Sequence, residues 1–250
     1  MMNKIVAYIR SRLQPYYTAE EVSALSRIVC CDLLGQAPTD YYLGKDIALS
    51  PKKEQELEDI LQRLSRFEPL QYIEGRTLFL GREFWVAPGV LIPRPETEEL
   101  VELMLKEIPA DARILDVGTG SGCIAISLAK ELPDALVTAW DVSPEALSVA
   151  RANARKLQSN VRFVECDVLA CQVDEVGLYD VIVSNPPYVT ETEKADMEPK
   201  CSSGSPHLLC LCPMMIPCAS IAALPSWGVT CWPMAAGFIL RSIGLMAARW

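Results

Sequence analysis

The chain has 250 residues, a formal net charge of −9 at pH 7 and a hydrophobic share of 50%. This length accommodates two modest domains or one large one. The acidic balance disfavours a protein that coats nucleic acid, because that kind of binding requires clustered Lys and Arg. The first ten residues lack the uninterrupted apolar core of a signal peptide, so we expect a cytoplasmic protein whose ten cysteines are thiols.

Residues 1–75 predict a small helical bundle. Thr18 and Glu21 have the spacing of a capping box, and Ser50-Pro51 places a hydroxyl cap before a proline at the first helical position. Apolar residues at helical spacing predict helices over 3–14, 18–35 and about 51–67. No catalytic constellation is visible here, and we expect this domain to help dock a substrate.

Residues 76–94 change character and predict a β-hairpin that links two domains. Two short strand patterns, 77–80 and 83–86, flank a Gly-Arg turn. The following stretch, Leu-Ile-Pro-Arg-Pro-Glu-Thr-Glu over residues 91–98, has two stiffening prolines and then acids in the first turn of a helix, where negative charge is favoured. It is either a linker before a well-capped helix or a segment that places Arg94 beside an active site.

A nucleotide-binding βα unit is predicted to begin at Arg113. Residues 113–117 have the pattern of a short buried strand, and residues 123–129 that of an apolar helix. Between them lies the loop Gly118-Thr119-Gly120-Ser121-Gly122. Glycines there let backbone approach a ligand, and the helix that follows offers free N–H groups.

Three more strand patterns end in acids or an amide. The strand over 136–140 ends at Asp141, which lies 23 residues after Gly118, close to the spacing of a carboxylate that holds ribose hydroxyls. The next strand leads to Asp167-Val168, which suits an adenine edge, and the fourth leads to Asn185. S-adenosylmethionine matches this set, with its ammonium and carboxylate at the loop, its ribose at Asp141 and its adenine at Asp167-Val168.

An NAD-dependent dehydrogenase is the alternative, because residues 120–125 match the dinucleotide-binding GxGxxA variant. Three features count against it: Asp116 just before the loop, the acid at the third strand end, and the Asn-Pro-Pro-Tyr sequence after the fourth.

Asn185-Pro186-Pro187-Tyr188 follows an apolar β-branched run, so it lies at the carboxyl edge of a predicted sheet, where ligands bind in open α/β folds. Each proline has a fixed φ and no N–H, which leaves nearby carbonyls available as acceptors. An amide, two stiff carbonyls and an aromatic ring form a cradle for a planar group that carries an NH₂. Taken by itself, this sequence would be an ordinary Pro-rich turn.

The three motifs, residues 91–98, 116–122 and 185–188, resemble in order and spacing the HemK/PrmC family of protein-glutamine N5-methyltransferases. Residues 68–73 and 84–90 are also similar to that family's interdomain region. The resemblance covers roughly residues 1–200. It implies S-adenosylmethionine-dependent methylation of the glutamine in the Gly-Gly-Gln motif of peptide-chain release factors, which supports translation termination.

The resemblance also implies roles for individual residues, with no metal. It places Gly118, Thr119, Gly120, Ser121, Gly122, Asp141, Val168 and Asn185 at the methyl donor, to which the strand-end pattern adds Asp167. Catalytic roles fall to Asn185, Pro186 and Tyr188, and substrate binding to Asn185, Pro186, Pro187 and Tyr188, to which the functional interpretation of residues 91–98 adds Arg94. The family often has an aromatic residue where this chain has Val168.

The expected fold is α/β. A Rossmann-like class I S-adenosylmethionine-dependent methyltransferase domain over residues 95–200, with its C-terminal part missing or aberrant, follows the small all-α bundle of residues 1–75 and the β-hairpin linker of residues 76–94. We expect a monomer with a protein substrate, no direct contact with nucleic acid and no membrane. Because Asn-Pro-Pro-Tyr also occurs in adenine-N6 DNA and RNA methyltransferases, that activity is the alternative; the acidic charge and residues 91–98 disfavour it.

Residues 201–250 form an anomalous tail. They contain no Asp, Glu or Lys and only two Arg, but five of the ten Cys. We interpret this tail as an out-of-frame translation that begins near Lys200. A membrane tail over 218–240 is a weaker interpretation because two prolines interrupt it, and a metal site is weaker still because its cysteines have no CxxC pairing.

The tail has a predicted structural consequence. Without a fifth strand, the apolar strand that leads to Asn185 would be a bare sheet edge, which favours aggregation. A second hypothesis is therefore an inactive remnant of the glutamine methyltransferase.

Overall fold

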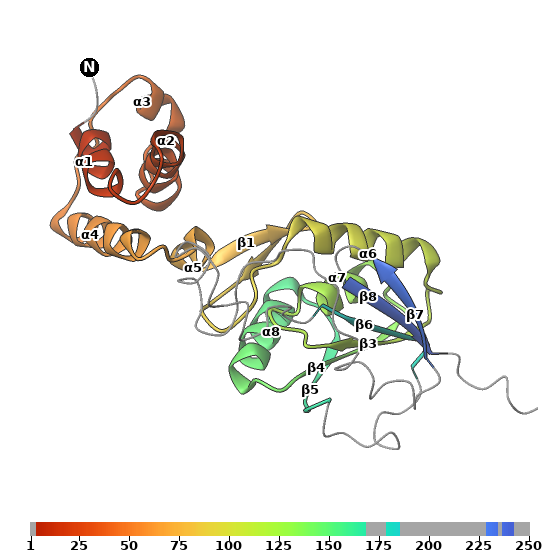
Figure 1. Ribbon diagram of the computed structural model, residues 1–250. Coiled ribbons are helices and arrows are strands. Elements are labelled where there is room, and N and C mark those ends of the chain that lie inside the picture. Colours follow the sequence, from red (N-terminus) through yellow and green to blue (C-terminus); the bar gives the residue numbers. More distant parts are fainter. Residues whose placement is uncertain (1–3, 169–178, 186–228, 235–236, 243–250) are drawn as a thin grey trace, which may run out of the picture. The chain divides into compact units, whose positions relative to one another are not determined.

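The computed structural model describes residues 4–168 and 179–185, together with the backbone of residues 229–234 and 237–242 (Figure 1). The chain divides into two compact units, Met1–Glu74 and Gly75–Trp250. Each unit has its own hydrophobic core.

The first unit is entirely helical in its described residues. Its elements are α1 (Lys4–Leu13), α2 (Ala19–Ile28), the π-helix η1 (Val29–Leu33), α3 (Pro38–Tyr42), α4 (Pro51–Ser65) and α5 (Leu70–Glu74). The apolar stripe of α4 is buried against α1, α2 and η1 and consists of Leu57, Ile60, Leu61 and Leu64. The apolar residues whose helical spacing predicted this helix therefore form its core-facing side.

The predicted caps in this unit are confirmed. Thr18 Oγ1 accepts a hydrogen bond from the Glu21 N–H at 3.3 Å, and Glu21 Oε2 accepts one from the Thr18 N–H at 2.8 Å. Ser50 Oγ accepts from the Lys53 N–H at the start of α4. The helix predicted over 18–35 is formed by α2 and, directly after it, the π turn η1, in which the Leu34 N–H bonds to the Val29 carbonyl five residues back.

The second unit begins with an antiparallel hairpin, β1 (Arg76–Phe79) and β2 (Arg82–Trp85), in which Phe79 faces Arg82. Its two-residue turn has positive φ at both Leu80 (47°) and Gly81 (70°), as the turns that match strand twist require. The Leu80 N–H donates to Glu98 Oε1 at 2.8 Å, so the turn is tied to α6 (Pro95–Glu107).

A six-stranded sheet forms the centre of the second unit, in the order β5-β4-β3-β6-β8-β7. Its first four strands are parallel, and their bounds are β3 (Arg113–Val117), β4 (Leu136–Asp141), β5 (Val161–Glu165) and β6 (Val181–Ser184). Helices α7 (Cys123–Glu131) and α8 (Pro144–Leu157) connect β3 to β4 and β4 to β5. These strands and helices confirm the predicted Rossmann-like arrangement of a class I methyltransferase domain.

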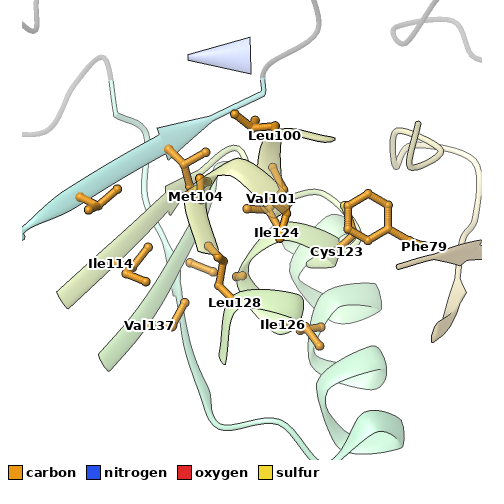
Figure 2. Packing of buried hydrophobic residues seen from close by; sticks show 14 of the residues in the cluster. Phe79, Leu100, Val101, Met104, Ile114, Cys123, Ile124, Ile126, Leu128 and Val137 are labelled. Atoms are coloured by element: carbon orange, nitrogen blue, oxygen red, sulfur yellow. The ribbon is translucent and has the colours of Figure 1, made fainter. Parts of the chain in front are cut away.

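The two faces of the sheet are both buried, as a parallel sheet requires. On one face, Ile114 and Val137 pack with side chains of α6 and α7 such as Met104 and Ile124, an arrangement that Figure 2 shows from close by. On the other face, Leu115, Trp140 and Ile182 form a separate cluster. Because strand side chains alternate between faces, adjacent residues of β3 enter different cores.

Strand β6 is not a bare edge, and that prediction was wrong. Strand β8 (Gly237–Ser242) pairs with it in antiparallel register, with Val183 opposite Ile239, and β7 (Val229–Met234) pairs with β8. Residues 229–242 lie in the tail, where we expected no strand. Pro233 and the scarcity of charged residues in the tail made the short β-branched and aromatic runs difficult to recognise as strands.

No helix in the described part of the chain combines the length and apolar content needed to cross a bilayer. Within the same residues, no three His, Cys, Asp or Glu side chains are grouped as metal ligands would be. The tail cysteines that were considered as ligands have side chains outside the described residues.

Candidate active site

The carboxyl ends of the four parallel strands lie at one edge of the sheet. The register pairs Val117 with Trp140 and with Ser184, and it pairs Asp141 with Glu165. The glycine loop, Asp141 and Asn185 directly follow or end these strands, so the structure brings them to the same edge. Ser184 Oγ donates to the Val117 carbonyl at 2.8 Å, which ties the end of β6 to the start of the loop.

The glycine loop is anchored to the end of β4. The N–H groups of Gly118 and Thr119 both donate to the Trp140 carbonyl, at 2.8 and 3.0 Å. The Gly120 N–H donates to Asp141 Oδ2 at 2.9 Å, while Asp141 Oδ1 accepts from the Ser143 N–H at 2.9 Å. Asp141 therefore fixes the loop and the start of α8 at the same time.

Asp116, the last buried residue of β3 before the loop, is only 1% exposed. Its Oδ2 accepts a hydrogen bond from Thr119 Oγ1 at 2.7 Å. The buried Oδ1 has no partner in hydrogen-bond geometry among the described residues, although the nearby Ala125 N–H still lowers the pKa of this carboxyl. Burial outweighs both favourable effects and, with the charge of Asp141, raises the pKa of Asp116 to about 7.

The raised pKa of Asp116 predicts a pH dependence of stability. An unfolded Asp titrates at the ordinary value of 3.8, so between that pH and about 7 the folded chain binds more protons than the unfolded chain. The stabilising contribution of protonated Asp116 is complete below the unfolded pKa and is lost as pH rises through the folded pKa. We therefore expect the stability of the donor-free wild type, measured by thermal unfolding, to fall between pH 5 and 8. In Asp116→Asn, which lacks this carboxyl, the fall should be smaller.

The control for this experiment is Asp111→Asn, which changes an exposed carboxyl before the same strand. It should keep the wild-type dependence on pH. Identical pH dependences for the wild type and Asp116→Asn would show that this carboxyl does not titrate in the folded chain within that range.

Gly122 ends the loop in the left-handed region, with φ of 81°, and is the N-cap residue of α7. A Cβ at this position would lie 2.8 Å from Ile126 Cδ1, 3.2 Å from Ala150 Cβ and 3.4 Å from Ala150 Cα. Ile126 can shift its terminal methyl, but the Ala150 contacts involve atoms fixed to the α8 backbone. The glycine therefore permits close packing of α7 against α8 as well as the turn.

We predict that Gly122→Ala lowers the free energy of unfolding by about 3 kcal/mol, from backbone strain and overpacking together. Gly118→Ala is the matched control, because Gly118 has a similar φ of 73° but, among the described residues other than its chain neighbours, no heavy atom lies within 4 Å of the point that a Cβ would occupy. Its cost should be about 1 kcal/mol from strain alone. Chemical denaturation measures both, and equal losses would show that the contacts with α8 do not matter.

The residues around the loop fit S-adenosylmethionine. An unsatisfied carboxylate oxygen on buried Asp116 suits a cationic ligand, and Asp141, although held by two backbone N–H groups, retains acceptor capacity for hydroxyls. Val142, next to it, is 65% exposed and offers an apolar surface to a ligand. At the end of β5, Asp167 is exposed and Val168 half-buried.

Asn185 follows β6, and its Nδ2 donates to Thr97 Oγ1 at 2.9 Å. Arg94 is the N-cap residue of α6, three residues before Thr97, and its buried Nε has no partner among the described residues. The structure thus brings the 91–98 segment next to Asn185. Pro186, Pro187 and Tyr188 lie outside the described residues.

Two buried polar residues were missed in the sequence. Thr97 is 3% exposed, and Asn153 of α8 is fully buried, with its amide bonded to both the N–H and the carbonyl of Trp85 and to the Ser121 carbonyl. A signal for both was present. Thr97 lies at helical spacing from Leu100 and Val101, and Asn153 from Ala150, so each is a polar residue on an apolar helix face.

Comparison with known families divides the chain in two. A model of the PrmC N-terminal domain matches residues 4–75, and a model of the methyltransferase small domain matches residues 87–200. Among solved structures, the T. thermophilus 16S rRNA N2 G1207 methyltransferase in complex with AdoMet and guanosine aligns over 67% of this chain and 49% of its own, with 18% identity and a TM-score of 0.45. Likeness at that level says nothing about this chain's substrate.

Curated relatives are much closer. The release factor glutamine methyltransferase of Bacteroides thetaiotaomicron is 57% identical over 212 residues, which are 85% of this chain and 76% of that protein. That of Koribacter versatilis is 47% identical over 161 residues, 64% of this chain and 57% of the relative. The methyl donor is S-adenosylmethionine. The chain belongs to the family of release factor glutamine methyltransferases.

Proposed function

We propose that this chain transfers a methyl group from S-adenosylmethionine to the side-chain nitrogen, N5, of the glutamine in the Gly-Gly-Gln motif of peptide-chain release factors. Family membership supports the reaction class and the substrate. The observation that carries the proposal for this site is the position of Asn185, whose amide is held at the carboxyl end of β6 beside the glycine loop. An amide at that point can bind a second amide.

The chemical difficulty of the reaction is the weak nucleophile. The lone pair of an amide nitrogen is delocalised into its carbonyl, so the substrate nitrogen needs acceptors that bind its two N–H groups and orient the lone pair. We assign these acceptors to Asn185 Oδ1 and the Pro186 carbonyl, with Pro187 and Tyr188 completing the cradle. Acceptors aimed at a nitrogen that gains positive charge stabilise the transition state, and correct alignment contributes much of the rate.

The methyl donor supplies an electrophilic methyl group on a sulfonium. In this proposal the loop Gly118 to Gly122 holds its amino-acid part, Asp141 the ribose hydroxyls, and Asp167 with Val168 the adenine edge. Asp141 has its loop contact already in place, so its carboxylate is preorganised before the donor binds. Val142 extends the apolar surface beside the ribose site.

Arg94 is proposed to contact the substrate near the cradle. Its buried, unpartnered Nε supports this, because a guanidinium nitrogen left without an acceptor in the described residues has capacity for one more hydrogen bond. A carbonyl of the bound release-factor loop is an acceptor of the right kind. The 1–74 unit is proposed to help dock the release factor, and the active species to be a cytoplasmic monomer.

The alternative activity, adenine-N6 methylation of DNA or RNA, has the same chemical target group and is not favoured by the relatives. The two are separated by incubating the chain with labelled S-adenosylmethionine and, in parallel, a release factor, duplex DNA and RNA. We expect label in the release factor alone. Label in nucleic acid with none in the release factor would reverse the assignment.

A further inference from the structure

Thr97 and Asn185 are 88 residues apart in the chain but in direct contact. Asn185 Nδ2 donates to Thr97 Oγ1 with a separation of 2.9 Å, and Thr97 is 3% exposed. This buried hydroxyl accepts from the amide nitrogen at the centre of the proposed site, and it does not cap α6, whose N-cap residue is Arg94.

Thr97 lies in the first turn of α6, which packs against the core of the second unit. The Thr97 N–H donates to the Arg94 carbonyl in this turn. The next turns are fixed by Leu100, Val101 and Met104, which are buried in the core that covers the sheet, as Figure 2 shows. The position of the Thr97 hydroxyl therefore follows from the packing of α6 and does not depend on the bond to Asn185 alone.

The two ends of an asparagine amide have nearly the same shape and opposite hydrogen-bonding character. If Asn185 Oδ1 faces the substrate, it accepts a hydrogen bond from the glutamine N–H. If Asn185 Nδ2 faces the substrate, its N–H groups and those of the glutamine are both donors and cannot bond. The Thr97 hydroxyl can donate as well as accept, and in this structure it accepts from Nδ2, which turns the nitrogen end of the amide toward Thr97 and the oxygen end away from it. We propose that Thr97 is a positioning residue that orients the Asn185 amide, so that its oxygen faces the glutamine nitrogen.

This inference rests on the proposed function and assigns a role to the 91–98 segment. In a purely structural role, the Thr97 hydroxyl would contribute to stability, and its removal would leave turnover per folded molecule unchanged. In the positioning role, removal of the hydroxyl lets the amide rotate between two orientations, of which one is inactive. The two roles therefore differ in kcat.

Thr97→Val replaces the hydroxyl by a methyl group of similar size, and Thr97→Ser restores it. We expect Thr97→Val to lower kcat for release-factor methylation about tenfold or more, the worth of one hydrogen bond that orients the Asn185 amide. KM and the Kd for S-adenosylmethionine should stay near wild type, and Thr97→Ser should recover most of kcat. Thr138→Val, the same change at a buried site within β4, should leave kcat unchanged.

A wild-type kcat in Thr97→Val, under conditions where Asn185→Ala is inactive, would overturn the inference.

A second measurement tests the role of Thr97 without any turnover. It still applies if the wild-type chain transfers no methyl group to a release factor, a result that would refute the proposed function. In nitrogen-15 spectra, the Asn185 side-chain amide is the signal lost in Asn185→Asp. Its protons should exchange slowly with solvent in the wild type and Thr97→Ser, and faster in Thr97→Val. Equal exchange in all three would contradict the orienting bond.

Discussion

Asn185→Ala is expected to lower kcat for release-factor methylation by about 10³-fold, because it removes an acceptor that acts on charge developing in the transition state. The effect should appear in kcat, since an interaction that strengthens as the nitrogen becomes positive contributes most at the transition state. The Kd for S-adenosylmethionine should change little, because the loop contacts that shape the donor site come from Trp140 and Asp141.

Stopped-time assays with labelled donor give kcat, and titration calorimetry gives the donor Kd on the same preparation. The control is Asn160→Ala, an exposed asparagine after α8, which should leave both values at wild type. Near-normal turnover by Asn185→Ala would refute the catalytic role of this amide. A loss confined to donor binding would show that Asn185 binds S-adenosylmethionine and does not act on the glutamine.

Asn153→Ala is expected to lower the free energy of unfolding by about 3 kcal/mol and to weaken donor binding about tenfold. Asn153 is fully buried, and its amide makes three hydrogen bonds of 2.7 to 3.0 Å that join β2 to the loop carbonyl of Ser121. Removal leaves one N–H and two carbonyl groups without their partner and creates a cavity. Because one of these carbonyls belongs to the glycine loop, loss of stability and loss of donor affinity should appear together.

Chemical denaturation and calorimetry test this pair of effects. Asn153→Asp is a shape-matched variant that keeps the acceptor for the Trp85 N–H but loses both donors, so it should be at least as damaging as the alanine variant. A variant with reduced stability but an unchanged donor Kd would show that the loop holds its shape without Asn153.

The four parallel strands between residues 113 and 184 were predictable because each is a short, largely apolar run that ends at a turn signal. Val181, Ile182 and Val183, for example, are β-branched and buried, and Asp141 and Ser143 mark a strand end and a helix cap. Such signals depend only on adjacent residues and are therefore visible in the sequence. The η1 turn was not predictable, because α- and π-turns present nearly the same apolar spacing over five residues.

The site was predictable where its residues follow strands, and not where they act from helices. Asp141 and Asn185 stand out as polar residues after apolar runs. Thr97 and Asn153 act across 88 and 68 residues of sequence, to Asn185 and Trp85, and nothing local identifies a partner so far away. Each could have been noticed as a polar residue on a buried helix face, but its partner could not.

The pairing of β8 with β6 alters the case for an inactive remnant. That hypothesis depended on an exposed apolar edge, and the edge is covered by residues 237–242 of the same chain. The out-of-frame interpretation of residues 201–250 remains a proposal, which sequencing of the gene beyond codon 200 would test. An in-frame reading through the tail would refute it.

The most direct measurement is mass spectrometry of a release factor after incubation with the chain and S-adenosylmethionine. We predict that one peptide, containing the Gly-Gly-Gln motif, gains the mass of a single methyl group, that fragmentation places it on the glutamine side chain, and that Asn185→Ala leaves the peptide unmodified. An unmodified peptide with wild-type chain that binds the donor, or equal modification by Asn185→Ala, would contradict the account.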